Sequence, residues 1–282
     1  MSTILTVLAV IAASPGLLIS PAELALALKE PATVVLAVSN NPADFEAGHI
    51  PDARFVRYDQ IAVEGDGLGS ELPPVEQLRA VFAAAGVSDR SNIIVYGTPI
   101  AATRMFFTLD YLGHPSVRVL NGGLNAWKAN GGAIESGAAQ RVTAGVLTSK
   151  PRPDVVATAD WITQRLSSPK ITLLDARPDA EFTGTDGGMG GAHVVGHLPD
   201  ARQLVWNTLL DSSGRFLPDA ELQKKLEAIG ATKGTPVVSY CLVGMRASVT
   251  YFVARHLGYD SRLYDGSIID WTRRKLPAKT GR

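Results

Sequence analysis

The feature that most constrains the fold of this 282-residue chain is an internal repeat. Three segments return in the same order, 144 or 148 positions later: 47–54 as 195–202, 93–96 as 237–240, and 120–127 as 264–271. Matching segments in one order indicate a duplicated domain rather than chance. The sequence therefore predicts two domains of one fold, at residues 15–135 and 155–282, joined by a linker at 136–154.

Each copy alternates short β-rich runs with longer helical stretches. In the second copy, 171–175, 236–240 and 262–264 have the composition of strands, and 219–229 and 247–257 that of helices. Such alternation is typical of an α/β fold, with a mainly parallel sheet flanked by helices. Because ligands of such sheets bind beyond the carboxyl ends of the strands, we expect the functional site at that edge.

The second copy also carries an insertion. Segment 183–192 holds five glycines and has no counterpart in the first copy. We expect a loop near the site. A phosphate-binding loop is the weaker interpretation, because no strand and helix flank these glycines.

Composition excludes several classes of protein. The 27 Lys and Arg residues balance 27 Asp and Glu residues, whereas a general nucleic-acid binder needs a basic face. A single cysteine excludes an internal disulfide and a Cys-rich zinc site, and suits a reducing compartment. We expect a cytoplasmic protein without stable membrane association. A periplasmic location stays open if the apolar segment 4–13 is a signal, although no Lys or Arg precedes Lys29.

The only cysteine, Cys241, lies between the predicted strand 236–240 and the predicted helix 247–257. Such a turn directs backbone N–H groups and the positive end of a helix toward an anion. This setting favours a thiolate and makes a nucleophile, so we expect an exposed, reactive thiol. The residues expected to bind the sulfur anion are Leu242, Val243, Gly244, Met245, Arg246 and Ala247.

The corresponding loop of the first copy differs. It is one residue shorter, has Gly97 in place of Cys241, and has no match for Arg246. It also contains Pro99, which has no N–H to donate. The first copy is therefore predicted to be catalytically inert.

These motifs together resemble the rhodanese superfamily, in particular its two-domain sulfurtransferases, over almost the whole chain. The resemblance rests on Gly-His-Ile/Leu-Pro-Asp-Ala in both halves, Asp-Ala-Arg at 175–177 with Glu181-Phe182, the loop 241–246, and Tyr-Asp-Gly-Ser at 264–267 ending at Trp271. It implies tandem α/β domains, an inactive N-terminal copy and a persulfide-forming cysteine in the C-terminal copy.

The chemistry that this implies is a double displacement without metal or organic cofactor. Cys241 attacks the sulfane sulfur of a donor such as thiosulfate, and a thiophile, cyanide or a cellular thiol, then takes the sulfur from the persulfide. A thioredoxin-like reductant is a possible partner. Arg246 either neutralises the donor's anionic end or ties the loop to neighbouring carboxylates.

Other prominent residues are better explained by structure. Arg177 is expected to pair with Asp175 or Glu181. His49 and His197 occupy matching positions of both copies, including the copy without a thiol, which indicates a structural role. The two tryptophans of the repeat, Trp127 and Trp271, are expected to anchor the core.

The donor is less strongly constrained. Mercaptopyruvate sulfurtransferases typically carry Cys-Gly-Ser-Gly and arginines before the second Gly-His motif. Here Leu242 and Val243 follow the cysteine, Glu181 stands where that branch has arginine, and no arginine occurs from 178 to 201. We favour thiosulfate as the donor, with 3-mercaptopyruvate as the alternative.

Two other functions stay open. Cysteine phosphatases and arsenate reductases place one more residue between cysteine and arginine than the four between Cys241 and Arg246, so a site for a single sulfur is favoured. A sulfur carrier whose partner is another protein would use the same thiol.

Overall fold

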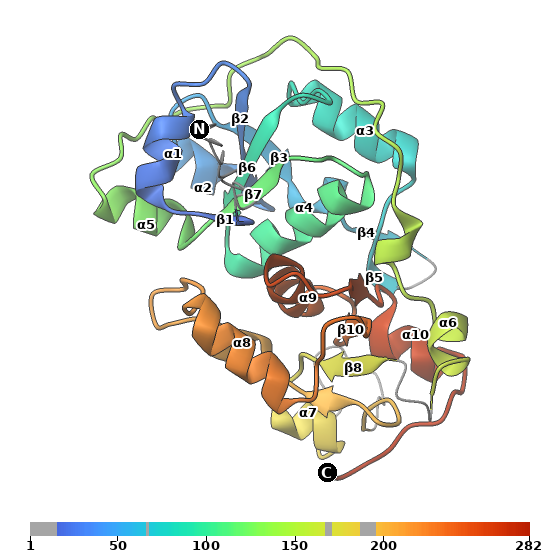
Figure 1. Ribbon diagram of the computed structural model, residues 1–282. Helices are drawn as coiled ribbons and strands as arrows, with labels where there is room; N and C mark the ends of the chain where they lie inside the picture. Colours follow the sequence, from blue (N-terminus) through green and yellow to red (C-terminus); the bar gives the residue numbers. More distant parts are fainter. Residues whose placement is uncertain (1–15, 66–67, 167–170, 187–195) are drawn as a thin grey trace, which may run out of the picture.

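The structure is a computed structural model that describes residues 16–65, 68–166, 171–186 and 196–282. Two α/β domains lie one above the other in Figure 1, with the amino-terminal half in blue to green and the carboxyl-terminal half in yellow to red. The candidate signal at 4–13 and most of the glycine-rich insertion lie outside the described residues. Within the described ranges, no helix is both long and apolar enough to cross a membrane.

The first domain contains a five-stranded parallel sheet in the order β1-β7-β6-β2-β3. Its strands are β1 (Leu18–Ile19), β2 (Thr33–Ser39), β3 (Arg54–Arg57), β6 (Asn92–Gly97) and β7 (Val117–Leu120). Its helices are α1 (Pro21–Ala27), α2 (Pro42–Ala47), α3 (Val75–Ala84), α4 (Pro99–Tyr111) and α5 (Gly123–Ala129). Side chains alternate along β2, with Val35 packed in the core under α1, α2 and α5, and Leu36 in the core under α3 and α4. Helices therefore cover both faces, as predicted.

The second domain repeats this design with a four-stranded parallel sheet in the order β11-β10-β8-β9. Its strands are β8 (Thr172–Asp175), β9 (Arg202–Gln203), β10 (Val237–Tyr240) and β11 (Ser261–Leu263). Its helices are α6 (Ala159–Thr163), α7 (Asp179–Thr183), α8 (Asp219–Ala228), α9 (Ala247–His256) and α10 (Ser267–Arg273). A parallel bridge from Val156 to Leu263 occupies the place that β1 has in the first domain.

Residues 131–152, between the two sheets in sequence, hold no helix or strand beyond one bridge at Glu135. The division into 15–135, linker 136–154 and 155–282 is consistent with this stretch, and we retain it as a proposal.

An antiparallel pair, β4 (Val63–Gly65) and β5 (Leu68–Glu71), joins the two domains. The pair follows β3 in the first domain. After β5, the N–H of Leu72 donates to a carboxylate oxygen of Asp265 in the second domain, at 2.9 Å. The first domain thus reaches to the loop that follows β11.

The domains meet along α4 and α9, which are equivalent helices of the repeat. Phe106 packs edge to face on Phe252, with ring centroids 4.9 Å apart, and Phe107 packs on Tyr251 in the same way, at 5.1 Å. Phe106 corresponds in the repeat to Tyr251, and Phe107 to Phe252. Exchanging the domains therefore exchanges these two contacts, so an approximate twofold axis relates the copies.

Polar contacts continue this interface. Thr103 and Ser248, also equivalent in the repeat, approach with their hydroxyl oxygens 3.0 Å apart. At the other end of α4, Asp110 accepts hydrogen bonds from the Tyr251 hydroxyl at 2.6 Å and from Arg255 at 2.8 Å. The two domains therefore share a continuous core and a buried polar network.

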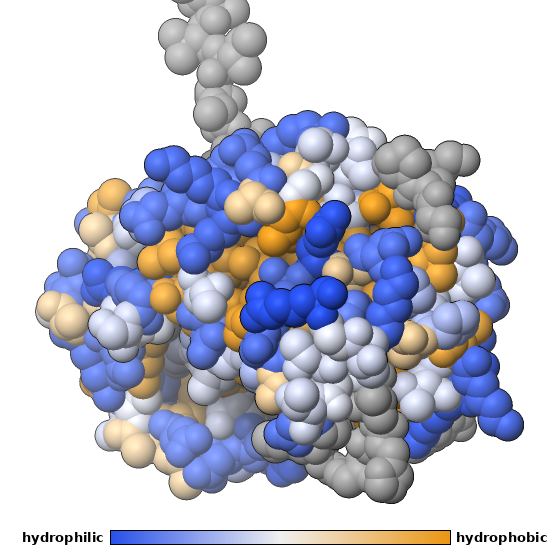
Figure 2. Space-filling view, turned by 90° about the horizontal axis from the view of Figure 1, so that it is seen from below, coloured by the Kyte–Doolittle hydropathy of each residue, from blue (hydrophilic) through white to orange (hydrophobic). Residues whose placement is uncertain are grey.

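The face seen in Figure 2 carries mainly hydrophilic residues, with hydrophobic ones in scattered groups between them. Among the described residues, the exposed large hydrophobic side chains are Leu26, Ile134 and Val146. Most large apolar side chains therefore lie in the core, as in other globular proteins.

Candidate functional site

Cys241 directly follows β10, at the carboxyl edge of the second sheet, where the sequence predicted it. Its N–H donates to the Ser267 hydroxyl at 3.1 Å, and its carbonyl accepts from Ile268 N–H at 3.2 Å. These bonds fix the cysteine backbone against the start of α10. Because β10 lies between β11 and β8, the loop after Cys241 starts from the interior of the sheet.

The prediction of an exposed thiol is wrong, because Cys241 is 0% exposed. The first domain covers part of the loop, which the loop's own sequence could not reveal. A Cβ atom built on Gly69 of β5 would lie 3.9 Å from the Val243 side chain. Tyr58 of the first domain and Met245 of the loop line the same cavity.

The loop after Cys241 presents unpaired backbone donors. From Leu242 to Ala247, no N–H donates to an acceptor anywhere in the described parts of the chain. The first amide after Cys241 that donates a hydrogen bond is that of Ser248, which donates to the carbonyls of Gly244 and Met245, at 3.2 Å each. Three of these residues, Leu242, Gly244 and Ala247, are buried. Since buried N–H groups almost always have a partner, their unpaired amides indicate a site for an acceptor from outside the chain.

Gly244 occupies a position that no other residue fits. Its φ of 82° lies in the left-handed region, which glycine adopts without steric cost. A Cβ atom there would approach a carboxylate oxygen of Asp265 to 2.5 Å and Arg104 to 3.3 Å. The glycine therefore lets the loop turn while its backbone lies against these two side chains.

Arg246 is held by Glu181 of α7. The two guanidinium nitrogens donate to the two carboxylate oxygens at 2.7 Å each. Burial acts to lower the pKa of Arg246, but the Glu181 hydrogen bonds and the charge of Cys241 outweigh it, so the pKa is raised. Of the two roles left open by the sequence, the structure shows the one in which Arg246 ties the loop to a carboxylate.

The first copy lacks this arrangement. Ala101 N–H donates to the Thr98 hydroxyl at 3.3 Å, Ala102 N–H donates to the Thr98 carbonyl at 2.9 Å, and Pro99 has no N–H. A Cβ atom on Gly97 would lie 2.6 Å from the Val38 carbonyl, so this position has no room for a cysteine side chain. The loop thus lacks the thiol, the room for it and most of the free donors.

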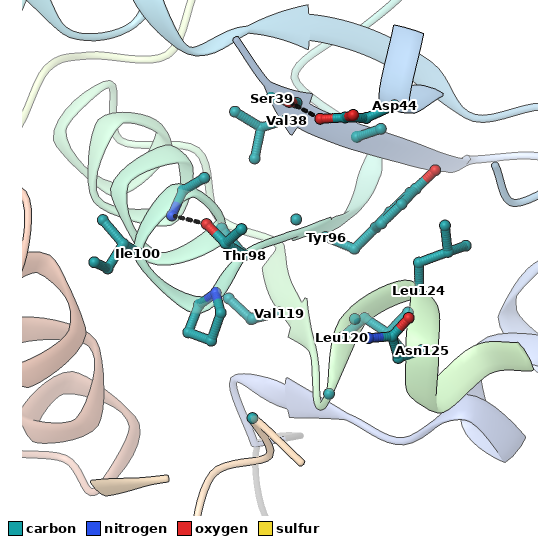
Figure 3. A pocket seen from close by; sticks show the side chains of 18 of the residues that line it. Val38, Ser39, Asp44, Tyr96, Thr98, Ile100, Val119, Leu120, Leu124 and Asn125 are labelled. Atoms are coloured by element: carbon teal, nitrogen blue, oxygen red, sulfur yellow. Dashed lines mark hydrogen bonds between the residues drawn. The ribbon is translucent and has the colours of Figure 1, made fainter. Parts of the chain in front are cut away.

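A cavity of about 570 Å³ nevertheless lies at this edge of the first sheet. In Figure 3, Thr98 and Ile100 at the start of α4 lie on one side, and Leu124 and Asn125 of α5 on the other. Asp44 is the only charged residue among those that line the cavity. No basic side chain lines it, and its lining extends to Tyr58 and to Met245 of the loop after Cys241.

Both histidines of the repeated motif have the structural role that the sequence predicted. The His49 ring stacks on Phe45 at 3.8 Å, and its Nδ1 lies 2.9 Å from the Phe45 carbonyl. The His197 ring stacks on Phe182 at 3.9 Å, and its Nδ1 lies 2.9 Å from the Phe182 carbonyl. Each histidine thus fixes the turn of its own domain.

The other residues assigned to structure also behave as expected. Arg177 is buried and pairs with Asp175 at 2.6 Å, while also donating to the Gly196 carbonyl at 2.7 Å. The indole N–H groups of Trp127 and Trp271 each donate to a carbonyl six residues later, at 2.8 Å. Both tryptophans are buried.

Four residues near the loop were missed by the sequence reasoning: Tyr58, Ser70, Arg104 and Asp265. Three of them come from the first domain, and only the fold brings them to the second. Asp265 lies in the Tyr-Asp-Gly-Ser motif, which was noted as part of the repeat. The available signal was Arg104, since its equivalent in the second copy is an apolar residue, Val249.

Comparison with known proteins agrees with the fold. The rhodanese-like domain family matches residues 20–130 and 158–274. A thiosulfate sulfurtransferase of Pseudomonas aeruginosa is 30% identical over 90% of this chain and 93% of its own length. A probable 3-mercaptopyruvate sulfurtransferase of the same bacterium is 31% identical over 95% of this chain and 99% of its own.

Among solved structures, SseA from Escherichia coli superposes with a TM-score of 0.78 at 23% identity, covering 90% of this chain and 99% of its own. That structure is described as showing the rhodanese fold of 3-mercaptopyruvate sulfotransferases. With both domains matched by the family and relatives named as sulfurtransferases along nearly the full length, this chain belongs to the rhodanese-like family as a two-domain member.

Proposed function

We propose that this protein is a thiosulfate sulfurtransferase that carries the transferred sulfur on Cys241 as a persulfide. The observation that supports this most is the run of six unpaired amides after the only cysteine. The Cys241 thiolate attacks the outer sulfur of thiosulfate and forms a new S–S bond. The S–S bond of the donor breaks, and its electron pair leaves with sulfite.

The persulfide carries one negative charge, and the residues proposed to hold it are Leu242 through Ala247. Their N–H groups stabilise the anion without a metal or an organic cofactor. Arg246 contributes its charge from a fixed position, because both of its terminal guanidinium nitrogens donate hydrogen bonds to the Glu181 carboxylate. A thiophile then attacks the outer sulfur and regenerates the thiolate. The proposed acceptor is cyanide in an assay and a thiol in the cell, with a thioredoxin-like reductant as candidate and the cytoplasm as expected compartment.

Thiosulfate is preferred to 3-mercaptopyruvate because of the cations near the loop. Arg246 is already paired with Glu181, and Arg177 with Asp175. Neither arginine is therefore free to replace the carboxylate-binding arginines typical of the mercaptopyruvate branch, which this sequence lacks. The relatives include proteins named for each donor, so kcat/KM for both must be compared on the purified protein.

The experiment that tests the function is intact-mass measurement. Incubation with thiosulfate should add the mass of one sulfur atom, and cyanide should remove it and yield thiocyanate. A mass shift without turnover would favour a sulfur carrier, the function named for a Thermus thermophilus relative that is 26% identical. Phosphate release from an aryl phosphate without thiocyanate formation would refute the proposal.

A further inference from the structure

Two hydroxyl groups of the first domain lie buried without a hydrogen-bond partner near the loop of Cys241. Among the described residues, the two hydroxyls contact each other outside normal hydrogen-bond geometry, and neither the Tyr58 hydroxyl nor the Ser70 hydroxyl has another partner. Tyr58 is 7% exposed and Ser70 is 1% exposed. A buried hydroxyl without a partner is unfavourable, so two at one place need an explanation.

The two hydroxyls belong to one cluster. Ser70 lies in β5, and its carbonyl accepts a hydrogen bond from Arg104 at 2.7 Å. Gly69, next to it, lies against Val243 of the loop. Tyr58 lines the same cavity as Met245 of the loop, and its pKa responds to the charges of Arg104 and Cys241 and to a hydrogen bond with Ser70.

From these contacts we infer that Tyr58 and Ser70 form a subsite for the oxyanion end of the sulfur donor, supplied by the catalytically silent first domain. This inference rests on the proposed function. In the attack on thiosulfate, the outer sulfur faces Cys241 and the sulfonate oxygens accept hydrogen bonds from the two hydroxyls. After the S–S bond breaks, the same hydroxyls hold the departing sulfite.

The chemistry of the groups suits this role. Burial is the main cause that raises the pKa of Tyr58, so the phenol stays protonated and able to donate at neutral pH. Arg104 adds little net charge, because Asp265 neutralises it. Neutral donors that are already oriented stabilise the bound anion without the strong charge attraction that would slow the release of sulfite. A hydrogen bond to a charged acceptor is also stronger than one between neutral groups.

The variants that test the subsite are Tyr58→Phe, Ser70→Ala and their combination. Each should lower kcat/KM for the donor by about tenfold, through loss of one hydrogen bond to an anion. The second half-reaction, measured from preformed persulfide to cyanide, should be unchanged. The thermal midpoint should change little, because the two hydroxyls make no hydrogen bond of normal geometry beyond their contact with each other.

Matched controls are Tyr96→Phe and Ser91→Ala, also buried and in the first domain. Their hydroxyls are paired, with Ile50 N–H at 3.3 Å and Ser88 N–H at 3.0 Å. These variants should lose stability and keep kcat/KM. Unchanged kcat/KM for both donors in the Tyr58→Phe/Ser70→Ala protein would overturn the subsite.

Both thiosulfate and 3-mercaptopyruvate carry an oxyanion, so both are assayed. A loss with only one of them supports the subsite and identifies the donor that it holds. Calorimetric binding of sulfite requires no sulfur transfer, and it should weaken about tenfold or more in the double variant. If the wild type forms no persulfide but binds sulfite through these hydroxyls, the proposed function fails while the subsite stands. Equal sulfite affinity in wild type and double variant refutes the subsite.

Discussion

Arg104 of the first domain and Asp265 of the second form a buried ion pair that lies against the backbone of Gly244. One guanidinium nitrogen donates to the carboxylate at 3.0 Å, the other is in closer contact, and Arg104 also binds the Ser70 carbonyl. Arg104 is 0% exposed and Asp265 is 5% exposed. The first copy therefore supports the loop of the second copy through a contact that crosses the domain boundary.

Breaking this pair from one side should be costly. Asp265→Asn leaves Arg104 as an uncompensated buried charge, which typically destabilises a protein by about 3–5 kcal/mol. Urea unfolding should show this loss, and Arg104→Met/Asp265→Asn should recover part of it. The exposed pair Lys279–Asp200, 3.2 Å apart, serves as control, and Asp200→Asn should leave stability nearly unchanged. Equal effects of the two single variants would contradict this account of the interface.

A second prediction separates backbone conformation from contact. Gly244 and Gly230 have nearly equal φ values, 82° and 81°, but a Cβ on Gly230 would meet nothing within 4 Å. Alanine at Gly230 should cost about 1 kcal/mol, because the left-handed conformation is unfavourable with a side chain. Gly244→Ala should cost more, because its Cβ would also lie 2.5 Å from the Asp265 carboxylate. Only Gly244→Ala should also reduce the rate of sulfur transfer. The added Cβ displaces the loop, and the loss of one hydrogen bond to the anion lowers the rate by about tenfold or more. Full activity of Gly244→Ala would show that the Asp265 contact does not position the loop.

The sequence predicted the fold well because the internal repeat allows the strands and turns assigned in one copy to be checked against the same positions of the other. The strands around Val95 and Val238 are buried and β-rich, and His49 and His197 sit in matching turns, so each copy supported the reading of the other. The burial of Cys241 was not predictable, because part of the cover of its loop, including Tyr58, Ser70 and Arg104, comes from the other domain. Ser70 is an ordinary polar residue in sequence. Its importance arises only from where β5 places it.

Replacing the nucleophile gives a third prediction. Cys241→Ser should abolish the mass shift with thiosulfate and the formation of thiocyanate, because a serine hydroxyl cannot form a persulfide. Since the side chain is fully buried, the variant also introduces a buried hydroxyl and should cost about 1–3 kcal/mol of stability. Cys241→Ala separates the two effects, with the same loss of activity and no buried hydroxyl. Sulfur transfer by either variant would exclude Cys241 as the carrier.

The loop of the first copy, which is predicted to be inert, offers a fourth test. Since Gly97 has no room for a side chain, the thiol is better placed at the next position, in a Thr98→Cys/Cys241→Ser protein. Thr98 lines the cavity of the first domain, so a small donor can reach it. We expect no sulfur loading in the intact-mass spectrum, because Pro99 has no N–H and the Ala102 amide stays bound to the Thr98 carbonyl. Loading at position 98 would mean that the loop amides matter less than the thiol.

Stability at alkaline pH gives the last prediction. Burial raises the pKa of Tyr96 to about 12, whereas a tyrosine of an unfolded chain ionises near about 10. Below the unfolded value both states hold the proton, so Tyr96 contributes no pH dependence there. As the pH rises from about 10 toward about 12, the unfolded chain loses the proton first, and the free energy of unfolding falls by about 1.4 kcal/mol per pH unit for this group. Other buried tyrosines add to the slope, and Tyr96→Phe should remove only its own share. Urea unfolding of wild type and variant between about pH 9 and 11.5 measures the difference, and parallel curves would show that Tyr96 ionises equally easily in both states.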